Sequence, residues 1–548
     1  MLTEIYCQEF KDCGKTREPI RLHSGLNIVL GPEHGSNSIG KSTFLLVVDF
    51  AFGGRAYAKS EDIIENVGPH DIEFVHEIDG TSYRFSRTPM EPGSVWRCDA
   101  QHEKTEQLSL DEFNAWLMSA YGMKQIGGSF RGAVSNFMRI YGKDNYNTRR
   151  PLEAFRQESI RTGITRILRL YEEYKPIEKA QRLLEDATKA KKTYLDSLRR
   201  DFIVAAKDKQ EYKRNQNRME DVQQQLDRLS HMASDNLLEL DPVVAEKTAR
   251  LKRELSALLR ARTELQSQLE AIGVDGDFSK LKRNGDFERL LEFFPNADVA
   301  SFEEVEAFHC GLEKALKAER KAAKQDIQRQ MSQLEDAISQ KEEEVMECGS
   351  SSNLTQEVLT EYHNLSHEIE VLKGANEAYL RKDELRQDEK KLREQRDSLI
   401  NYSLKTVESR LNEKMAELDF FAREGEANPP KIEFTNSSSY SFGVSNDTGT
   451  GTHARALALF DLAVLEQTSL PAIIQDSVTL KQIGDRRMVK LMELYDHVEK
   501  QVFIALDKAE SYGEGQTPDV VKDNVALSLS RGHELFGRSW AAKREDNE

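Results

Sequence analysis

The chain has 548 residues, of which 38% are hydrophobic and 31% charged, and its formal net charge is -17 at pH 7. This length allows three or four ordinary domains, and a mean hydropathy of -0.63 is typical of a protein with much of its length in solvated helices. The acidic balance argues against a generally cationic nucleic-acid coat protein, so any DNA site must be a local basic patch.

Five cysteines are scattered along the chain without C-x-x-C spacing, namely Cys7, Cys13, Cys98, Cys310 and Cys348. We therefore expect reduced thiols and no metal framework. The N-terminus is polar, and the chain has no apolar run of the roughly 18 residues that a membrane span requires. These features predict a cytoplasmic protein with no membrane partner.

The strongest local pattern lies near the N-terminus. The apolar run Leu26–Leu30 predicts a buried strand that ends at Gly31, and residues 35–42 read GSNSIGKS. The apolar segment from Thr43 to Phe52 predicts a helix that Gly53 and Gly54 stop. The eight residues fit G-x-x-x-x-G-K-[ST], and strand, loop and helix follow in the order that a phosphate-binding loop requires. The alternative is a chance glycine-rich turn.

Each residue type in this loop has a chemical role. Glycines let successive backbone N–H groups face an anion at a helix N-terminus. Lys41 brings a positive charge to the β- and γ-phosphates, and the Ser42 hydroxyl is a ligand for Mg²⁺. We therefore predict a site for ATP and Mg²⁺ with Lys41 in a catalytic role. The predicted nucleotide contacts are Gly35, Ser36, Asn37, Ser38, Ile39, Gly40, Lys41, Ser42 and Thr43.

The remainder of the N-terminal part resembles one half of an α/β domain. A polar hairpin is expected from Lys11 to Glu18, where Lys15 and Arg17 either touch the nucleotide or are solvated loop charges. Alternating apolar residues in 72–87 predict a second hairpin around an Asp-Gly turn. Residues 109–122 predict a helix that begins after a serine cap.

Residues 129–170 are unusually basic, with nine Lys and Arg against three Asp and Glu, an excess of +6. Aromatic residues interleave with the arginines. Such a patch can bind the phosphates of DNA; the alternative is that the arginines pair with acids across the fold or brace the next helix. The candidate DNA contacts are Arg131, Arg139, Arg149, Arg150 and Arg156.

Long helices are predicted in the middle of the chain. Leucines in 251–272 and apolar residues in 327–372 alternate at spacings of three and four, which is a coiled-coil register. Two tracts of similar length with a turn-rich joint favour one antiparallel hairpin. Interruptions are expected at Ser234-Asp235-Asn236 with Asp241-Pro242, and at residues 348–353. The predicted domains are 1–170 (N-terminal half of the head), 171–272 (outgoing arm), 273–301 (arm tip), 302–420 (returning arm) and 421–548 (C-terminal half of the head).

The C-terminal part again has α/β character. Strands are predicted at 431–434 and 440–444, followed by a glycine-rich turn with Thr450-Gly451-Thr452 and an apolar helix from Ala454 to Glu466. Buried strands are predicted at 471–476 and 501–506. A single α/β head would therefore be assembled from halves that lie some 400 residues apart.

This arrangement resembles the SMC/Rad50/RecN class of ABC ATPases over essentially the whole chain. Within that class it is similar to the short bacterial SMC-like subunit of Lamassu-type anti-phage defence systems. The shared phrases are residues 37–43 (NSIGKST), 293–295 (FFP) with 308–309 (FH), 474–477 (IQDS) and 535–537 (LFG).

The resemblance implies roles for several residues. Asp476 would be the Walker B aspartate that holds Mg²⁺ together with Ser42, unless it is an ordinary strand-end residue. Thr450, Gly451 and Thr452 stand where the class has a signature turn that contacts ATP on a second molecule; the alternative is a helix cap. Ser477 stands where the class has the glutamate that orients the attacking water.

Two further departures from the class concern turnover. Asp507 falls near the expected switch histidine, and residues 136–147 contain no obvious Q-loop glutamine. A serine is not a general base near neutral pH without an activating neighbour. Hydrolysis would then be slow, or would use another carboxylate such as Asp485.

The resemblance implies an SMC-like protein that forms a homodimer through ATP-bound heads and binds or senses double-stranded DNA. Effector (nuclease-like) and accessory subunits from the same operon would be its partners in anti-phage or anti-plasmid defence. The alternatives are an SMC/RecN-like DNA repair ATPase and a coiled-coil scaffold that binds ATP with little hydrolysis.

Overall fold

The structure is a computed structural model, and it describes residues 1–32, 39–199, 203–237, 247, 250–251, 253–262, 265, 325–345, 353–423, 428–513 and 515–538. The chain divides into two compact units. We call Met1–Lys192 with Leu385–Glu548 the head unit, and Thr193–Glu384 the arm unit. Among the residues described, no helix is both long enough and apolar enough to cross a lipid bilayer.

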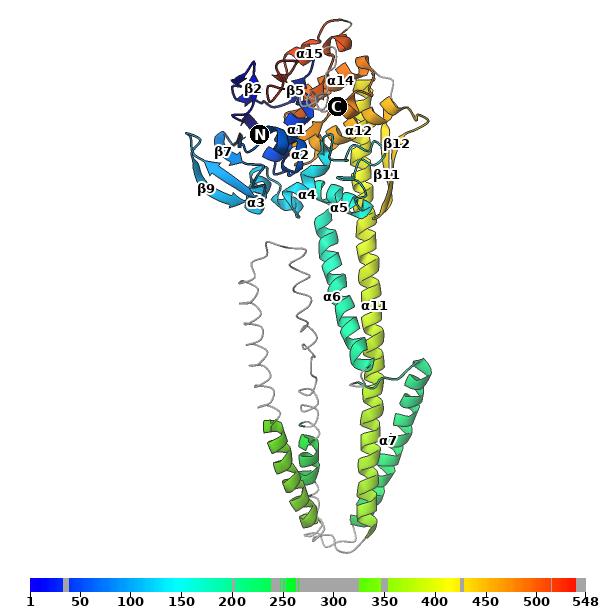
Figure 1. The fold of residues 1–548 in the computed structure, drawn as a ribbon. Coiled ribbons are helices and arrows are strands. Elements are labelled where there is room, and N and C mark those ends of the chain that lie inside the picture. Colours follow the sequence, from blue (N-terminus) through cyan, green and yellow to red (C-terminus); the bar gives the residue numbers. More distant parts are fainter. Residues whose placement is uncertain are drawn as a thin grey trace, which may run out of the picture. The chain divides into compact units, whose positions relative to one another are not determined.

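A parallel sheet joins the two ends of the chain in the head unit (Figure 1). Its order is β10-β13-β14-β5-β15. The strands are β5 (Leu26–Leu30), β10 (Met138–Arg139), β13 (Ala472–Gln475), β14 (Gln501–Leu506) and β15 (Val525–Ser528). Because β5 lies between two strands from the C-terminal half, the predicted assembly of one α/β head from both ends of the chain is confirmed.

A second, antiparallel sheet comes from the N-terminal half alone, in the order β4-β1-β6-β7-β8-β9. Its strands are β1 (Leu2–Tyr6), β4 (Ile20–Arg21), β6 (Ile72–Ile78), β7 (Thr81–Arg87), β8 (Ser94–Cys98) and β9 (Lys104–Ser109). The turn between β6 and β7 has Asp79 and Gly80 at φ 50° and 75°, as a two-residue hairpin requires. The predicted hairpin is therefore confirmed.

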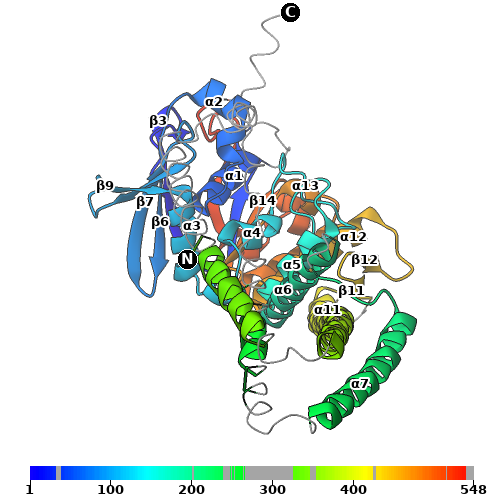
Figure 2. The ribbon, with the colours of Figure 1, turned by 90° about the horizontal axis from the view of Figure 1, so that it is seen from below.

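Helices cover these sheets according to their apolar patterns. Helix α3 (Leu110–Ala120) begins with a capping box between Ser109 and Glu112, as predicted. Helix α1 (Lys41–Ala51) packs on β5 and β14, and Figure 2 shows it next to β14. Helix α12 (Thr450–Gln467) is buried on every side from Ala454 to Leu465, because it is apolar all round except for Arg455 and Asp461, which form buried ion pairs.

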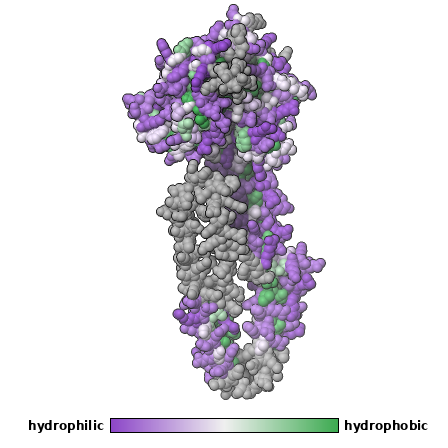
Figure 3. All heavy atoms as spheres, viewed as in Figure 1, coloured by the Kyte–Doolittle hydropathy of each residue, from purple (hydrophilic) through white to green (hydrophobic). Residues whose placement is uncertain are grey.

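Short elements complete the head unit, whose visible face is mainly hydrophilic (Figure 3). They are β2 (Lys11–Asp12), β3 (Lys15–Thr16), α2 (Glu61–Val67), α4 (Phe130–Val134), α5 (Ile160–Leu170), β11 (Pro430–Asn436), β12 (Ser439–Val444), α13 (Ser477–Leu480), α14 (Asp485–Asp496) and α15 (Asp519–Lys522).

Antiparallel helix pairs occur in both units. In the head unit, α6 (Tyr174–Arg199) contacts the returning helix α11 (Asn353–Ala422) through Lys191 and Glu389. In the arm unit, Arg218 of α7 (Lys209–Leu237) pairs with Glu368 of α11 at 2.7 Å. Val222 and Leu226 pack there on Leu365. The predicted antiparallel helical hairpin is thus confirmed for the described segments.

The outgoing helical tract has one described interruption that was not predicted. Helix α7 includes Ser234-Asp235-Asn236, and its described part ends at Leu237, so the predicted interruption at 234–242 stays a prediction. The described residues 203–208, between α6 and α7, are non-helical, and the Ala206 N–H donates to the Ala375 carbonyl (3.0 Å). Asp241-Pro242 and the predicted tip, 273–301, lie outside the described residues.

Candidate nucleotide site

The described part of the phosphate loop places its last residues at the start of α1. Gly40 caps the helix at φ 102°, and a Cβ there would lie 2.5 Å from the Cβ of Leu535. Glycine is required at this position for both reasons. Ile39, Lys41, Ser42 and Thr43 line one cavity with Gly40. Gly35, Ser36, Asn37 and Ser38 lie outside the described residues, so the anion cradle that they would form stays a prediction.

Lys41 has an acidic partner that the sequence did not reveal. Its Nζ lies 2.7 Å from Asp507 Oδ1, and the two side chains are only 8% and 4% exposed. Asp507 follows β14, and its other oxygen is 2.9 Å from Lys481 Nζ. Gly31 makes room for this pair, because a Cβ at residue 31 would lie 2.1 Å from Asp507 Oδ1. A phosphate that binds to Lys41 must therefore compete with a carboxylate.

Asp476 lies at the C-terminal end of β13, at the same sheet edge as the phosphate loop. Its side chain is buried, and its Oδ2 accepts a hydrogen bond from the Tyr141 backbone N–H (3.0 Å). The Ser477 hydroxyl donates to its Oδ1 (3.2 Å). Ligands of parallel α/β sheets bind at the carboxyl ends of the strands. The position suits a carboxylate that would hold Mg²⁺ through water while the Ser42 hydroxyl binds the ion directly, and oxygen ligands of this kind fit Mg²⁺.

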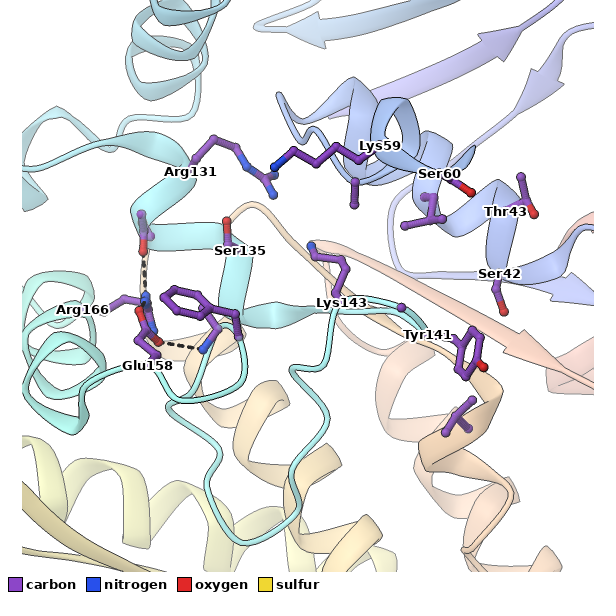
Figure 4. Close-up of a pocket in the computed structure, with 18 of the residues that line it drawn as sticks. Ser42, Thr43, Lys59, Ser60, Arg131, Ser135, Tyr141, Lys143, Glu158 and Arg166 are labelled. Atoms are coloured by element: carbon purple, nitrogen blue, oxygen red, sulfur yellow. Dashed lines mark hydrogen bonds and ion pairs between the residues drawn. The ribbon is translucent and has the colours of Figure 1, made fainter. Parts of the chain in front are cut away.

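Tyr141 belongs to residues 136–147, the segment that contains no Q-loop glutamine. It is 61% exposed and lines the cavity with Ser42 and Ser477. Figure 4 shows Tyr141 and Ser42 on the same side of the cavity. Its backbone N–H also donates to Asp476, so Tyr141 connects the cavity wall with this carboxylate.

The cavity has a volume of about 1630 Å³, well above the roughly 300–1,000 Å³ of an ordinary ligand pocket. We call it the head cavity. It extends from α1 to α5, and its lining is rich in cations. Figure 4 shows Lys59, Arg131 and Lys143 pointing into it. The basic residues of its lining are Lys41, Lys59, Arg131, Lys143, Arg161, Arg166, Arg169, Lys481 and Arg538.

Buried Asp49 on α1 holds two of these cations. Its Oδ1 lies 2.8 Å from Arg131 Nη2 and 2.9 Å from Lys143 Nζ. Burial opposes ionisation of Asp49, but the two cations outweigh it and lower the pKa of Asp49 from 3.8 to about 2. Burial also lowers the pKa of Lys143 to about 8, against the attraction of Asp49. We assign a charged cluster at neutral pH because each partner lies within hydrogen-bond distance.

The DNA contact predicted for Arg139 is wrong. Its side chain is fully buried, and its guanidinium makes bonds of 2.6 and 2.7 Å to both oxygens of Asp461. It also donates to the carbonyls of Asn145 and Pro151. Arg139 therefore braces the two halves of the head against each other, which is the alternative stated for the basic segment.

The other four candidates have different environments. Arg131 is engaged with Asp49 and with the Phe52 carbonyl. Arg150 is 55% exposed and pairs with Glu153 at 2.8 Å, whereas Arg149 and Arg156 are exposed. Of the five, these two and Arg150 therefore remain able to contact a DNA backbone.

The signature-like turn opens α12. Gly449 is the N-cap, and Asp447 accepts from its N–H (2.9 Å) and from the Thr452 hydroxyl (2.9 Å). A Cβ on Gly451 would lie 2.4 Å from the Gln482 carbonyl, so this glycine is needed within the fold. Thr450 is exposed, which leaves it available to a second molecule.

Three minor candidates lie elsewhere. Arg17 donates to the carbonyls of Lys11 and His533, which is neither of the roles expected from the sequence. Lys15 is exposed on β3. Asp485 is the exposed first residue of α14 and is not part of the head cavity's lining, whereas Asp507 is the carboxylate beside the phosphate-loop lysine.

Comparisons with known proteins give a limited likeness. Residues 408–540 match a family described as an uncharacterised protein conserved in bacteria (DUF2326). No curated protein matches the chain. A solved structure of the Smc head domain with a coiled coil and joint from Pyrococcus yayanosii is similar, at 14% identity and a TM-score of 0.42, over 96% of this chain and 94% of that one.

A second similar structure is the Smc head domain with an extended coiled coil from Pyrococcus furiosus, bound to the C-terminal domain of ScpA. Its identity is 10% and its TM-score 0.34, over 96% of this chain and 92% of that one.

Proposed function

We propose that this chain is an SMC-like ATPase subunit whose head binds ATP with Mg²⁺. The observation that carries the proposal is Lys41 at the N-terminus of α1, with Ser42 beside it and buried Asp476 at the same sheet edge. A lysine for the phosphates, a hydroxyl for Mg²⁺ and a strand-end aspartate make up the essential set for a nucleoside triphosphate.

The test is ATP binding by calorimetry on the full chain. Lys41→Ala should weaken binding by about 2–3 kcal/mol, the size of a charge-assisted contact. Lys490→Ala is the matched control, since that lysine pairs with Glu493 on α14 and is not part of the head cavity's lining. Equal affinity in Lys41→Ala and wild type would contradict the proposed site.

We further propose slow hydrolysis. Ser477 borders the head cavity and donates to Asp476, so it offers no free base to an attacking water. Ser477→Glu should speed phosphate release by roughly 10²–10⁴-fold, the range of a placed general base. Fast release in wild type with no gain in Ser477→Glu would favour a repair-type ATPase of steady turnover, and Asp507→Asn would then test the carboxylate beside Lys41.

Two ATP-bound heads would pair through the turn at Thr450. Because Gly451 is packed on the Gln482 carbonyl, Thr450→Arg is the cleaner probe of the surface. It should abolish ATP-dependent association in light scattering, while the control Thr435→Arg, on an exposed position of β11, should not. Normal pairing of Thr450→Arg would reduce the turn to a helix cap.

Double-stranded DNA is the proposed ligand of the exposed basic residues Arg149 and Arg156. Changing both to Glu should weaken duplex binding and flatten its dependence on salt. Arg182→Glu, 74% exposed on α6, is the control. An unchanged salt slope would contradict a DNA site on this segment and favour a scaffold role.

The proposed biological role is control of an effector (nuclease-like) subunit in Lamassu-type anti-phage or anti-plasmid defence, together with accessory subunits of the same operon. Its support is the resemblance of sequence phrases. Phage plating on cells that carry the operon tests it. Lys41→Ala should remove protection, and full protection by that variant would contradict an ATP-gated sensor.

A further inference from the structure

The C-terminal segment of the head meets the N-terminal hairpin at three side chains that can bind a metal. Asp12 and Cys13 lie at the β2–β3 turn, and His533 lies in the segment after β15. One ligand atom from each lies within 4.8 Å of the other two. His533 Nδ1 is 2.5 Å from Asp12 Oδ1, and Cys13 Sγ is 3.6 Å from Nδ1 and 3.7 Å from Nε2 of the same ring.

Backbone contacts hold these residues in place independently of any ion. Cys13 has φ 49° and is followed by Gly14 at φ 79° in a two-residue turn, which fixes the thiol at the hairpin tip. The segment that carries His533 is tied to the same hairpin by two bonds, from the Lys11 N–H to the Leu535 carbonyl (3.0 Å) and from Arg17 Nη2 to the His533 carbonyl (2.8 Å). The backbone therefore holds the three residues together without an ion.

The chemistry of the three groups selects the ion. Mg²⁺ and Ca²⁺ prefer oxygen ligands, whereas Zn²⁺ accepts a thiolate, an imidazole and a carboxylate together. With Zn–S of about 2.3 Å and Zn–N of about 2.0–2.1 Å, tetrahedral ligand atoms lie about 3.5 Å apart. The sulfur–nitrogen distances of 3.6 and 3.7 Å fit this spacing. The Nδ1–Oδ1 distance of 2.5 Å is that of a hydrogen bond, so these two atoms must separate by about 1 Å when the ion enters.

We propose that Asp12, Cys13 and His533 bind one Zn²⁺, with water in the fourth position. His533 and Asp12 are 48% and 45% exposed, so the ion can enter from solvent. On binding, the Cys13 thiol releases its proton to solvent, and the ring proton of His533 moves to Nε2 as Nδ1 becomes the ligand. Arg17 Nη1, 3.6 Å from Asp12 Oδ2, takes the other carboxylate oxygen, and its charge makes the site weaker than a four-ligand structural site.

The ion would fasten the C-terminal segment to the N-terminal hairpin, and this segment in turn contacts the phosphate loop. Two residues after His533, the Leu535 N–H donates to the Ile39 carbonyl (3.1 Å), and the Leu535 side chain packs on Gly40. The ring of Phe536 lies 5.5 Å from that of Phe10. Zn²⁺ should therefore stabilise the head, because it adds a cross-link between residues 520 apart in sequence.

The experiment uses the reduced, chelator-treated full chain and Zn²⁺ alone. Wild type should bind one Zn²⁺ by competition calorimetry and melt at a higher temperature with the ion than without it. Co²⁺ should give a thiolate-to-cobalt charge-transfer band. Cys13→Ser and His533→Ala should each weaken binding at least about tenfold and remove the cobalt band. Asp12→Asn should weaken binding with the band retained.

Cys98→Ser and His497→Ala are the controls, because these residues lie elsewhere in the head, on β8 and after α14. Each variant is first checked for ATP binding without Zn²⁺, so that loss of folding is recognised. Zn²⁺ binding that survives in Cys13→Ser and His533→Ala, or a wild type with no cobalt band and no rise in melting temperature, would overturn the proposal.

Discussion

Two buried ion pairs connect the N- and C-terminal halves of the head, and they differ in how completely the fold satisfies them. Arg139 and Asp461 make two mutual bonds, and further donors and acceptors of the head surround them, including the Gln475 amide (3.0 Å). Lys41 Nζ and Asp507 Oδ1 lie 2.7 Å apart, and Lys41 also lines the head cavity, whereas Arg139 lies wholly inside the fold. The Arg139 pair therefore has a structural role, while the proposed phosphate would compete with Asp507 for Lys41.

The largest expected effect is therefore on stability, from Arg139. Arg139→Met leaves buried Asp461 without its partner and should destabilise the head by about 3–5 kcal/mol. Urea unfolding of the full chain measures this. Arg149→Met is the matched control, an exposed arginine of the same segment, and should stay within about 0.5 kcal/mol. An equal loss of unfolding free energy in Arg139→Met and Arg149→Met would contradict a structural role for the buried pair.

The ion cluster of Asp49, Arg131 and Lys143 lies within the N-terminal half. A substitution of Asp49 tests whether this cluster stabilises the head as the Arg139–Asp461 pair does. Because its pKa is lowered from 3.8 to about 2, its ionised form contributes stability above pH 3.8. That contribution is lost as the pH falls through 2. Asp49→Asn should thus cost about 2 kcal/mol at neutral pH, and the difference from wild type should shrink between about pH 4 and 2. A pH-independent difference would mean that packing, not charge, accounts for the effect.

Asp507 tests the exchangeable pair. Asp507→Asn keeps the shape of the side chain but removes the charge that competes with phosphate for Lys41. ATP affinity by calorimetry should rise about tenfold, or about 1.4 kcal/mol. At the same time the nucleotide-free protein should melt lower, since Lys41 loses its carboxylate. A fall in affinity would instead indicate that Asp507 assists nucleotide or Mg²⁺ binding.

The smallest effect is expected from Lys481, the second cation on Asp507. Its side chain is 52% exposed, so solvent screens the pair, which is worth at most about 1 kcal/mol. Lys481→Ala should weaken ATP binding slightly, by less than about fivefold, because Asp507 then acts on Lys41 alone. A loss as large as that of Lys41→Ala would show that the two lysines act as one site.

The sequence predicted the parts of the head that rest on local pattern. The strand Leu26–Leu30 and the helix after it lie next to the phosphate loop, and the turn at Asp79-Gly80 carries its own conformational signal. Ion pairs between distant segments could not be predicted in this way. No residue near Arg139 in the sequence indicates its partner Asp461, which is 322 residues away. Without that partner, Arg139 counted as one more cation of a basic segment that was predicted to bind DNA.

Short elements were also missed. Strand β10 has two residues and β15 has four, too few for an alternating pattern to emerge. The break between α6 and α7 did carry a signal. Asp208 accepts from the Glu211 N–H, and Glu211 accepts from the Lys207 N–H. The pattern D-x-x-E marks such a helix start, and it was not recognised within a charged helical tract.

The interior position of β5, between β14 and β15, has a consequence for biosynthesis. Leu26 pairs with Val502, and Ile28 pairs with Val525. Both neighbouring strands are therefore synthesised only near the end of translation. At 5–20 residues per second, the wait lasts roughly half a minute to a minute and a half. During that time a hydrophobic strand has no partner on either side and can pair with other nascent chains. A ribosome-bound chaperone that shields residues 26–30 should therefore raise the yield of native protein more than one acting after release.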